Sequence, residues 1–193
     1  MMPISAICFD AFGTLITQTG RRINPYRRLV QGVDQDAERL PFLTRDVAID
    51  VFADELGLSH LIPVIRRELA EELAALELFP EVIEVIRKLR AAGKRLAVCS
   101  NIASEYGPMI RQLLPDLNSY ILSYEIGAAK PATEIYSAVC QALGSRPRDV
   151  LFIGDSKRCD LYGPQAFGMQ ARLLNRSDGE TLLDALKGVL YTK

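Results

Sequence analysis

The sequence predicts an α/β fold: a Rossmann-like core with a parallel sheet of about five strands, and a small all-helical cap domain. Three observations support this prediction. Short apolar, β-branched runs alternate with helical patterns along most of the chain, as in parallel sheets whose strands are joined by right-handed helical crossovers. The length of 193 residues fits one domain with an insertion. The segment 17–78 has helical patterns and no strand-like run.

Five short apolar runs are expected to form strands buried on both faces, because helices cover both faces of a parallel sheet. These runs are 4–9, 95–99, 120–123, 150–153 and 170–174. Helical patterns precede or follow them. They span about 80–93, 104–114, 131–144 and 179–190, and the first and third have a proline at the start and a glycine at the end.

The segment 17–78 is expected to form the cap, which leaves 1–16 and 79–193 as the core. Thr44 can cap a first helix that ends at Gly57, and a second helix follows it. The apolar residues at helical spacing are Ala48, Phe52 and Leu56 in the first helix, and Ile65, Leu69, Leu73 and Leu76 in the second. Open α/β sheets bind ligands beyond the C-terminal ends of their strands, so we expect this insertion to act as a lid.

The composition excludes several classes of function. The chain has 23 basic and 24 acidic residues, so it has no cationic field for nucleic acid. No apolar run approaches the roughly 18 residues that span a bilayer, and no basic region precedes an apolar stretch at the start, as a secretory signal requires. The four cysteines are scattered and expected to be reduced. We therefore expect a cytoplasmic monomer or homodimer that binds a small molecule, without nucleic-acid or membrane partners.

Because His60 is the only histidine, the chemistry is expected to depend on carboxylates. Asp10 follows the first apolar run, and Gly13 and Thr14 then form a tight turn. This aspartate either caps the turn or is a nucleophile surrounded by backbone amides. At the end of the second run, Ser100 and Asn101 can form an anion site at a helix start, although an ordinary helix cap is the commoner role of this pair.

Two further clusters lie at the ends of later strands. Lys130 precedes a proline that begins a helix, and it can either project a charge into the crevice or be solvated. Asp155 follows a glycine at the end of its strand, and Asp160 lies five residues later at a helix start. Helix capping explains Asp160 but explains Asp155 less well. The two carboxylates can therefore face one small volume.

Taken together and in this order, Asp10, Ser100, Lys130 and Asp155 resemble the motifs of the haloacid dehalogenase-like superfamily of aspartate-nucleophile hydrolases, and the resemblance spans the whole chain. It implies that Asp10 is the nucleophile, and that Ser100, Asn101 and Lys130 assist it. The return of the chain from the cap at 78–81 is also similar to the family pattern.

Phe12 departs from the pattern of the family's phosphatases, which have an aspartate here as general acid and base. An aromatic residue at this position is similar to the family's 2-haloacid dehalogenases, whose leaving halide needs no proton. Phe12 can also simply pack the cap against the core. With Gly13 and Thr14, it is expected to contact the substrate.

The charge of the predicted site, by contrast, favours a metal-dependent phosphatase over a dehalogenase. Asp10, Asp155 and Asp160 bring three negative charges, and Lys130 returns one positive charge, so a divalent cation is expected to complete the balance. Mg²⁺ suits such oxygen ligands, and the resemblance adds the backbone carbonyl of Phe12 to them. The dehalogenases, as a family, use no metal and lack an acid at the position of Asp155.

The cap segment is rich in arginine and contains no lysine, which excludes the family branch that uses a cap lysine as a Schiff base. Its arginines are Arg21, Arg22, Arg27, Arg28, Arg39, Arg45, Arg66 and Arg67. We expect Arg27 and Arg28, beside Asn24 and Tyr26, to be able to clamp a substrate carboxylate or phosphate, and Arg66 and Arg67 to form a solvated face with Glu68, Glu71 and Glu72. The sequence favours a Mg²⁺-dependent phosphatase of weak or narrow activity on small phosphorylated metabolites. The alternatives are a metal-independent 2-haloacid dehalogenase and a non-catalytic ligand-binding protein of the family.

Overall fold

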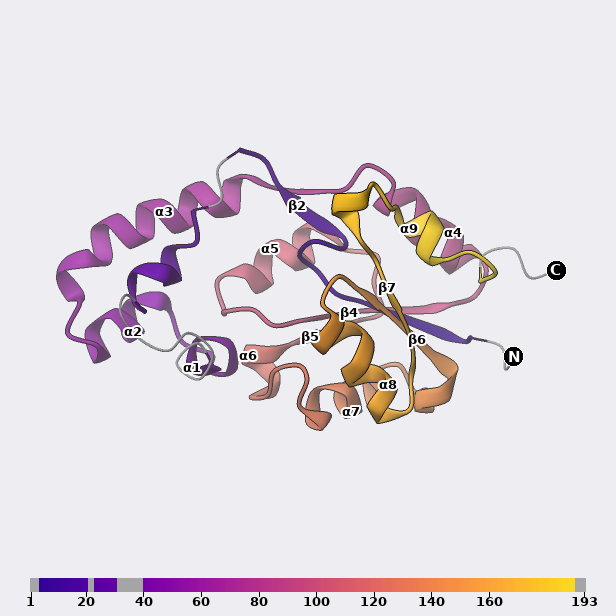
Figure 1. Cartoon of the computed structure of the whole chain (residues 1–193). Helices are drawn as coiled ribbons and strands as arrows, with labels where there is room; N and C mark the ends of the chain where they lie inside the picture. The colour runs from indigo at the N-terminus through magenta and orange to yellow at the C-terminus, as the bar shows by residue number, and fades with distance from the viewer. Residues whose placement is uncertain (1–3, 21–22, 31–39, 190–193) are drawn as a thin grey trace.

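A five-stranded parallel sheet forms the centre of the molecule (Figure 1). The computed structural model describes residues 4–20, 23–30 and 40–189. The strand order is β5-β4-β1-β6-β7. The strands are β1 (Ala6–Phe9), β4 (Arg95–Ser100), β5 (Ser119–Leu122), β6 (Val150–Gly154) and β7 (Gln170–Leu173). All five predicted strands are thus confirmed, and β1 lies between β4 and β6 at the middle of the sheet.

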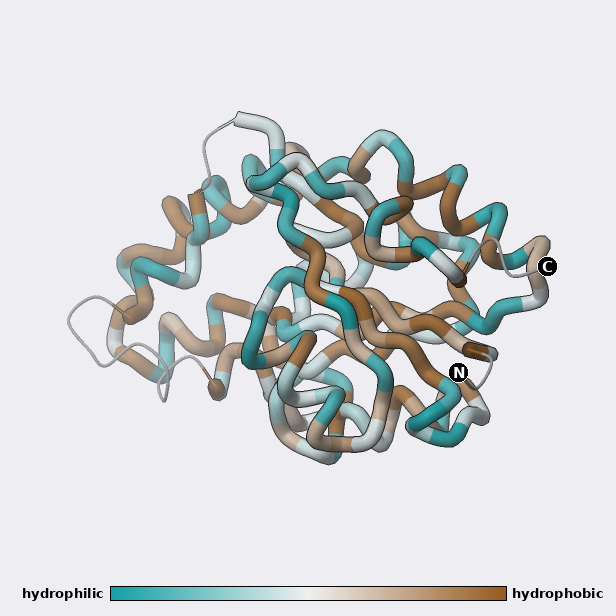
Figure 2. Tube along the Cα trace, turned by 45° about the vertical axis from the view of Figure 1, so that its right-hand side comes forward, coloured by the Kyte–Doolittle hydropathy of each residue, from teal (hydrophilic) through white to brown (hydrophobic). Residues whose placement is uncertain are grey.

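Alternate residues of each strand enter two separate cores. In β1, Ile7 and Phe9 belong to the core under α4 (Val82–Ala91), α5 (Tyr106–Leu113) and α9 (Leu182–Ala185), whereas Ala6 and Cys8 face α7 (Thr133–Ala142). The short helix α8 (Gly163–Phe167) covers the same face as α7 (Figure 1). Hydrophobic residues accordingly follow the central strands in Figure 2. Burial on both faces explains why the strands are apolar throughout.

The remaining short elements connect the strands to the helices. They are α6 (Ser123–Ile126), a π-helical turn η4 (Lys157–Tyr162), and the 3₁₀ turns η1 (Pro25–Arg28), η2 (Ser59–Leu61), η3 (Pro147–Asp149) and η5 (Arg176–Asp178). The predicted helix at 179–190 is shorter than expected: α9 spans Leu182–Ala185, and a capping box between Thr181 and Asp184 sets its start. Its last predicted residue lies outside the described residues.

The segment 17–78, which is called the cap below, has three α-helices among its described residues: α1 (Leu40–Thr44), α2 (Ile49–Glu55) and α3 (Ile62–Ala74). The prediction that Thr44 caps α2 is wrong, because Thr44 is the last residue of α1 and its hydroxyl donates to the carbonyl of Leu40. The backbone N–H of Ile49 at the start of α2 instead donates to the carboxylate of Glu105 in the core, at 2.5 Å. A contact between distant residues thus replaces the local cap.

A two-stranded antiparallel ribbon joins the cap to the core. It pairs β2 (Ile16–Gln18) with β3 (Leu76–Leu78), so that Ile16 lies opposite Leu78. The prediction that residues 17–78 contain no strand is therefore wrong, since each strand is three residues long and its partner is distant in the sequence. The ribbon crosses the expected cap boundaries at residues 17 and 78, which stay a prediction.

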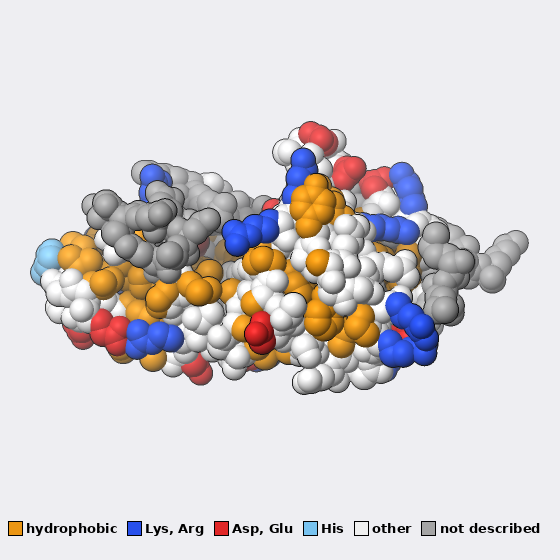
Figure 3. Space-filling view, turned by 60° about the horizontal axis from the view of Figure 1, so that its bottom comes forward, with side chains coloured by type: hydrophobic (Ala, Val, Ile, Leu, Met, Phe, Trp, Pro, Cys, Tyr) orange, Lys and Arg blue, Asp and Glu red, His pale blue; other side chains and the backbone are white. Residues whose placement is uncertain are grey.

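The described surface mixes acidic, basic and apolar side chains (Figure 3). His60 is exposed in η2, and all four cysteines are free thiols. Among the described residues, no helix has the length and apolar character needed to cross a membrane.

Candidate active site

The predicted functional residues converge at the C-terminal edge of the parallel sheet. Asp10 follows β1 directly, and its backbone N–H donates to the carbonyl of Ile153 in β6 at 2.8 Å. Ser100 ends β4, and Asp155 follows the last residue of β6. Because parallel strands end at the same edge, side chains that are far apart in the sequence meet there.

Lys130 lies beneath this edge and links two of the carboxylates. Its ammonium group donates to Oδ1 of Asp10 at 2.7 Å, to Oδ1 of Asp160 at 2.8 Å and to the carbonyl of Cys99 at 2.9 Å. The side chain is 2% exposed. The alternative of a solvated lysine is therefore wrong: the charge of Lys130 lies within the carboxylate cluster, where all three of its donors are used.

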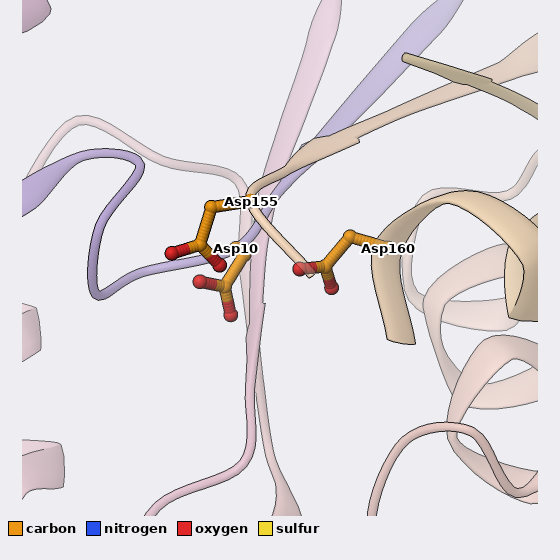
Figure 4. A group of neighbouring side chains, drawn as sticks. All are labelled: Asp10, Asp155 and Asp160. Carbon is orange, nitrogen blue, oxygen red and sulfur yellow. The ribbon is translucent and has the colours of Figure 1, made fainter. Parts of the chain in front are cut away.

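Three carboxylates form one cluster, and Figure 4 shows Asp10, Asp155 and Asp160 directed toward a common point. One ligand atom from each lies within 4.8 Å of the others, and Asp10 and Asp160 are buried while Asp155 is exposed. Asp160 also accepts from the backbone N–H of Ser156 at 2.9 Å. The N-cap of η4 is Ser156, which accepts from the N–H of Cys159, so Asp160 also bonds the start of this turn through the N–H of its capping residue.

Burial and charge shift the proton affinities of this cluster. Burial raises the pKa of Asp10 to about 7, and the negative charges of Asp160 and Asp155 add to the rise, which Lys130 partly opposes. For Lys130, burial lowers the pKa, but the charges of Asp10 and Asp160 outweigh this effect and hold its pKa well above the usual range. Lys130 is therefore charged at neutral pH, and Asp10 is poised between its two protonation states.

Two glycines make room for the cluster. A Cβ on Gly13, whose φ is +74°, would lie 2.2 Å from Oδ2 of Asp155, and one on Gly154 would lie 2.4 Å from Cγ of Asp160. The backbone N–H of Gly13 donates to the carbonyl of Ile16, at 2.9 Å. The turn itself thus uses this amide, and a contact between Gly13 and a substrate stays a prediction.

Three further predicted residues have different positions from those expected. Helix α5 begins only at Tyr106, so neither Ser100 nor Asn101 caps a helix or lies at a helix start. The side-chain amide of Asn101 instead bonds both backbone groups of Lys130, at 2.7 and 2.8 Å. Thr14 is fully buried, so its side chain does not reach a ligand at the sheet edge. Asn101 therefore positions Lys130, and Thr14 is part of the core.

A cavity of about 240 Å³ is lined by residues of the cap segment and of the core, among them Phe12, two residues after Asp10, and Asn101, which follows Ser100. Four aromatic rings contribute to its wall, and Phe12 and Tyr106 come from the core. The edge of one ring faces the other, with centroids 5.8 Å apart and planes at 89°. Phe12 therefore packs against another core residue and also forms part of the cavity wall, and its packing of the cap against the core stays a prediction.

Among the described arginines of the cap, one lines this cavity and the others do not. Arg27 lines it. Arg28 forms a two-pronged ion pair with Glu68, at 2.5 and 2.6 Å, and does not line it, so its prediction as a substrate clamp is wrong. The solvated pairs are Arg45 with Glu55, Arg66 with Asp50 and Arg67 with Glu71. Arg21, Arg22 and Arg39 lie outside the described residues.

Sequence reasoning missed a buried carboxylate in the cap. Glu72 was expected on a solvated face, but it is 6% exposed, lines the cavity and accepts from the backbone N–H of Asn24 at 2.8 Å. Asn24 has a positive φ of 52°, an unusual conformation that asparagine tolerates better than most residues. The only signal in the sequence was the position of Glu72 on the apolar stripe of α3, between Leu69 and Leu76.

Two contacts between distant segments were also missed. Glu105 accepts from the hydroxyl of Tyr26 and from the backbone N–H of Ile49, both at 2.5 Å, and so ties the cap to the core. Arg176 pairs with Glu81 at 2.5 Å and donates to the carbonyl of Thr14 at 2.5 Å, which fixes the base of the ribbon. No local pattern in the sequence indicates either contact.

Comparison with known proteins shows which proteins this chain is similar to. A family model described as haloacid dehalogenase-like hydrolase matches residues 4–168. A phosphatase from Mycobacterium tuberculosis is 30% identical over 93% of this chain and 91% of its own, and an (S)-2-haloacid dehalogenase from Pseudomonas is 27% identical over 91% and 86%. A HAD family enzyme from Bacteroides thetaiotaomicron, in complex with magnesium and inorganic phosphate, has a TM-score of 0.71 and 21% identity, with 89% of this chain and 94% of that one covered. The chain is thus similar to both a phosphatase and a dehalogenase over most of its length.

Proposed function

Because this chain belongs to the haloacid dehalogenase-like hydrolases, we propose that it is a Mg²⁺-dependent phosphatase that acts on small phosphorylated metabolites. The observation that carries the proposal is the third carboxylate. Asp10 and Asp160 already share Lys130, and Asp155 adds another negative charge at the exposed side of the same cluster. A metal-free dehalogenase has no use for this additional charge.

The donor set fits a hard divalent cation. Carboxylate oxygens of Asp10, Asp155 and Asp160 lie close enough to share one ion, and the family resemblance adds the backbone carbonyl of Phe12. Mg²⁺ prefers such oxygen ligands and keeps several waters. When bound, it would supply positive charge that offsets the carboxylates and the phosphoryl oxygens.

In the proposed reaction, a carboxylate oxygen of Asp10 attacks phosphorus, and the bond from phosphorus to the leaving oxygen breaks. Water then hydrolyses the aspartyl phosphate. Lys130 holds the carboxylate of Asp10 in place through its 2.7 Å hydrogen bond, and Asn101 holds the backbone of Lys130. Since Phe12 stands where the family's phosphatases have their acid, the leaving group departs without a proton from that position. Ser100, buried at the end of β4, stays a predicted contact for the phosphoryl group.

One observation favours a second candidate, a metal-independent 2-haloacid dehalogenase. Phe12, two residues after the nucleophile Asp10, is an apolar part of the cavity wall, which suits a leaving halide that takes no proton. Arg27 lines the same cavity and offers a cation for a substrate carboxylate. In this reaction, Asp10 would attack the carbon that carries the halogen.

A substrate panel with and without Mg²⁺ tests the proposal. It contains acetyl phosphate, hexose phosphates and 2-chloropropionate, and the D10N variant serves as the control for each. We expect hydrolysis of phosphate esters or acyl phosphates that requires Mg²⁺ and is lost in D10N. Release of chloride that is unaffected by a metal chelator, together with no phosphate release, would favour the dehalogenase instead.

A further inference from the structure

The wall of the cavity between cap and core contains four aromatic rings. Phe12 and Tyr106 from the core lie with Tyr26 and Phe42 from the cap, so aromatic rings come from both sides. The rings of Tyr26 and Phe42 are 5.4 Å apart and tilted by 52°. Aromatic rings pack favourably against one another in tilted and edge-to-face arrangements, so this wall suits another aromatic ring.

The volume of the cavity limits the size of the ligand that it can hold. Its volume is about 240 Å³, whereas an apolar cavity of about 150 Å³ holds one benzene molecule. A substituted six-membered ring therefore fits. Its polar lining residues are Asn24, Arg27, Glu72 and Asn101, and the guanidinium of Arg27 can donate to a ring substituent.

Phe12 connects the cavity to the reaction. The same side chain that lines the cavity takes the place of the acid that would protonate the leaving oxygen. A phenolate, whose conjugate acid has a pKa of about 10, leaves without a proton far more readily than an alkoxide. Phe12 thus stands in the place of the acid and also provides a surface for a phenolate, which is a leaving group with little need of that acid.

We propose that the cavity binds the leaving group of a small aryl phosphate, a phosphate ester of a phenol with one ring. This inference rests on the proposed phosphatase function and assigns its substrate class. The phosphoryl group faces Asp10, and the ring lies between Phe12 and the aromatic residues of the cap.

Three esters of similar size separate the effect of the aromatic ring from the effect of the leaving group. Phenyl phosphate has both the ring and the good leaving group, benzyl phosphate has the ring with an alkoxide leaving group, and cyclohexyl phosphate has neither. We expect kcat/KM for phenyl phosphate to exceed that for benzyl phosphate by roughly 10²-fold through kcat. We expect KM for benzyl phosphate to be below that for cyclohexyl phosphate by roughly tenfold.

Substitutions test the cavity itself. F42L is expected to lower the ratio of kcat/KM for phenyl phosphate over acetyl phosphate by roughly tenfold. F167L is the matched control and should leave this ratio unchanged. Phe167 is an aromatic residue of α8 that packs against Tyr136 in the core on the other face of the sheet. If F42L does not fold, calorimetry on the wild-type protein with Mg²⁺ gives a second reading, in which phenylphosphonate should bind more tightly than methylphosphonate.

The outcomes separate this inference from the proposed function. Hydrolysis of acetyl phosphate with equal kcat/KM for the three esters, or equal binding of the two phosphonates, would overturn the aryl substrate class and leave the phosphatase in place. Absence of Mg²⁺-dependent hydrolysis of every phosphate tested would overturn the proposed function and this inference with it.

Discussion

The ammonium group of Lys130 lies 2.7 Å from Oδ1 of Asp10, and both side chains are buried. This contact lowers the pKa of Asp10, but burial and the neighbouring aspartates outweigh it and raise the pKa to about 7. The carboxyl of an unfolded aspartate has a pKa of about 3.9. At pH values between the unfolded and the folded pKa, Asp10 therefore binds more protons in the folded metal-free protein than in the unfolded chain.

The pH dependence of stability follows from this difference. Between pH 4 and 7, Asp10 should make the metal-free protein less stable as the pH rises, by at most about 1.4 kcal/mol per pH unit for one proton. Above pH 7, its contribution should be constant. Urea unfolding in a chelator measures this, with D10N as the reference that cancels all other groups. A difference between wild type and D10N that grows in favour of wild type as the pH rises would contradict the raised pKa.

Asp155 is exposed, so its substitution should affect metal binding more than folding. We expect D155N to lose calorimetric Mg²⁺ binding while its free energy of unfolding without metal changes by less than about 1 kcal/mol. E134Q, at an exposed acid on α7, is the matched control and should bind Mg²⁺ as wild type does. Equal Mg²⁺ affinity in D155N and wild type would remove the main support for the metal-dependent reaction.

Phe12 should limit the range of leaving groups. In F12D, the new carboxyl can protonate an alkoxide, so kcat for alkyl phosphates should rise by up to about 10²-fold, with little change for acetyl phosphate. F12N loses the same ring without gaining an acid and should show no rise. Both variants lose the contact with Tyr106, at a cost of about 1–3 kcal/mol of stability. If F12D folds, binds Mg²⁺ and gains nothing over F12N, the missing acid does not limit the reaction.

Glu105 should hold the cap against the core. Removal of its carboxylate in E105A leaves the Tyr26 hydroxyl and the Ile49 N–H without this partner. We expect a loss of about 1–3 kcal/mol of stability and a higher KM for substrates that fill the cavity. Y26F removes one of the two bonds and should lose less stability. Wild-type stability and KM in E105A would show that these bonds do not hold the cap in place.

The sequence predicted the sheet and the convergence of the site well, because both depend on local patterns. Asp10 and Asp155 each follow an apolar strand directly, and parallel strands bring such residues to one edge. The direction of each side chain was harder to predict. The sequence left open whether Lys130 is solvated or directed at the site, and its ion pairs with two buried carboxylates hold it in the cluster.

The contacts between cap and core could not be predicted from local patterns. Glu105 meets Ile49 across 56 residues of sequence, and Arg176 meets Glu81 across 95. The ribbon between β2 and β3 likewise pairs short segments whose own patterns are too brief to indicate strands. The cavity depends on these contacts, so its aromatic wall became apparent only in the folded structure.

The central claim is that Asp10 is the nucleophile of a phosphoryl transfer, and a single-turnover experiment tests it most directly. The protein with Mg²⁺ is mixed with less than one equivalent of acetyl phosphate and quenched with acid at a series of times that span the turnover, and its peptides are mapped by mass spectrometry. The account predicts a transient phosphoryl group on the peptide that contains Asp10, and none in D10N. A phosphoryl group on any other residue, or complete turnover in D10N, would contradict it.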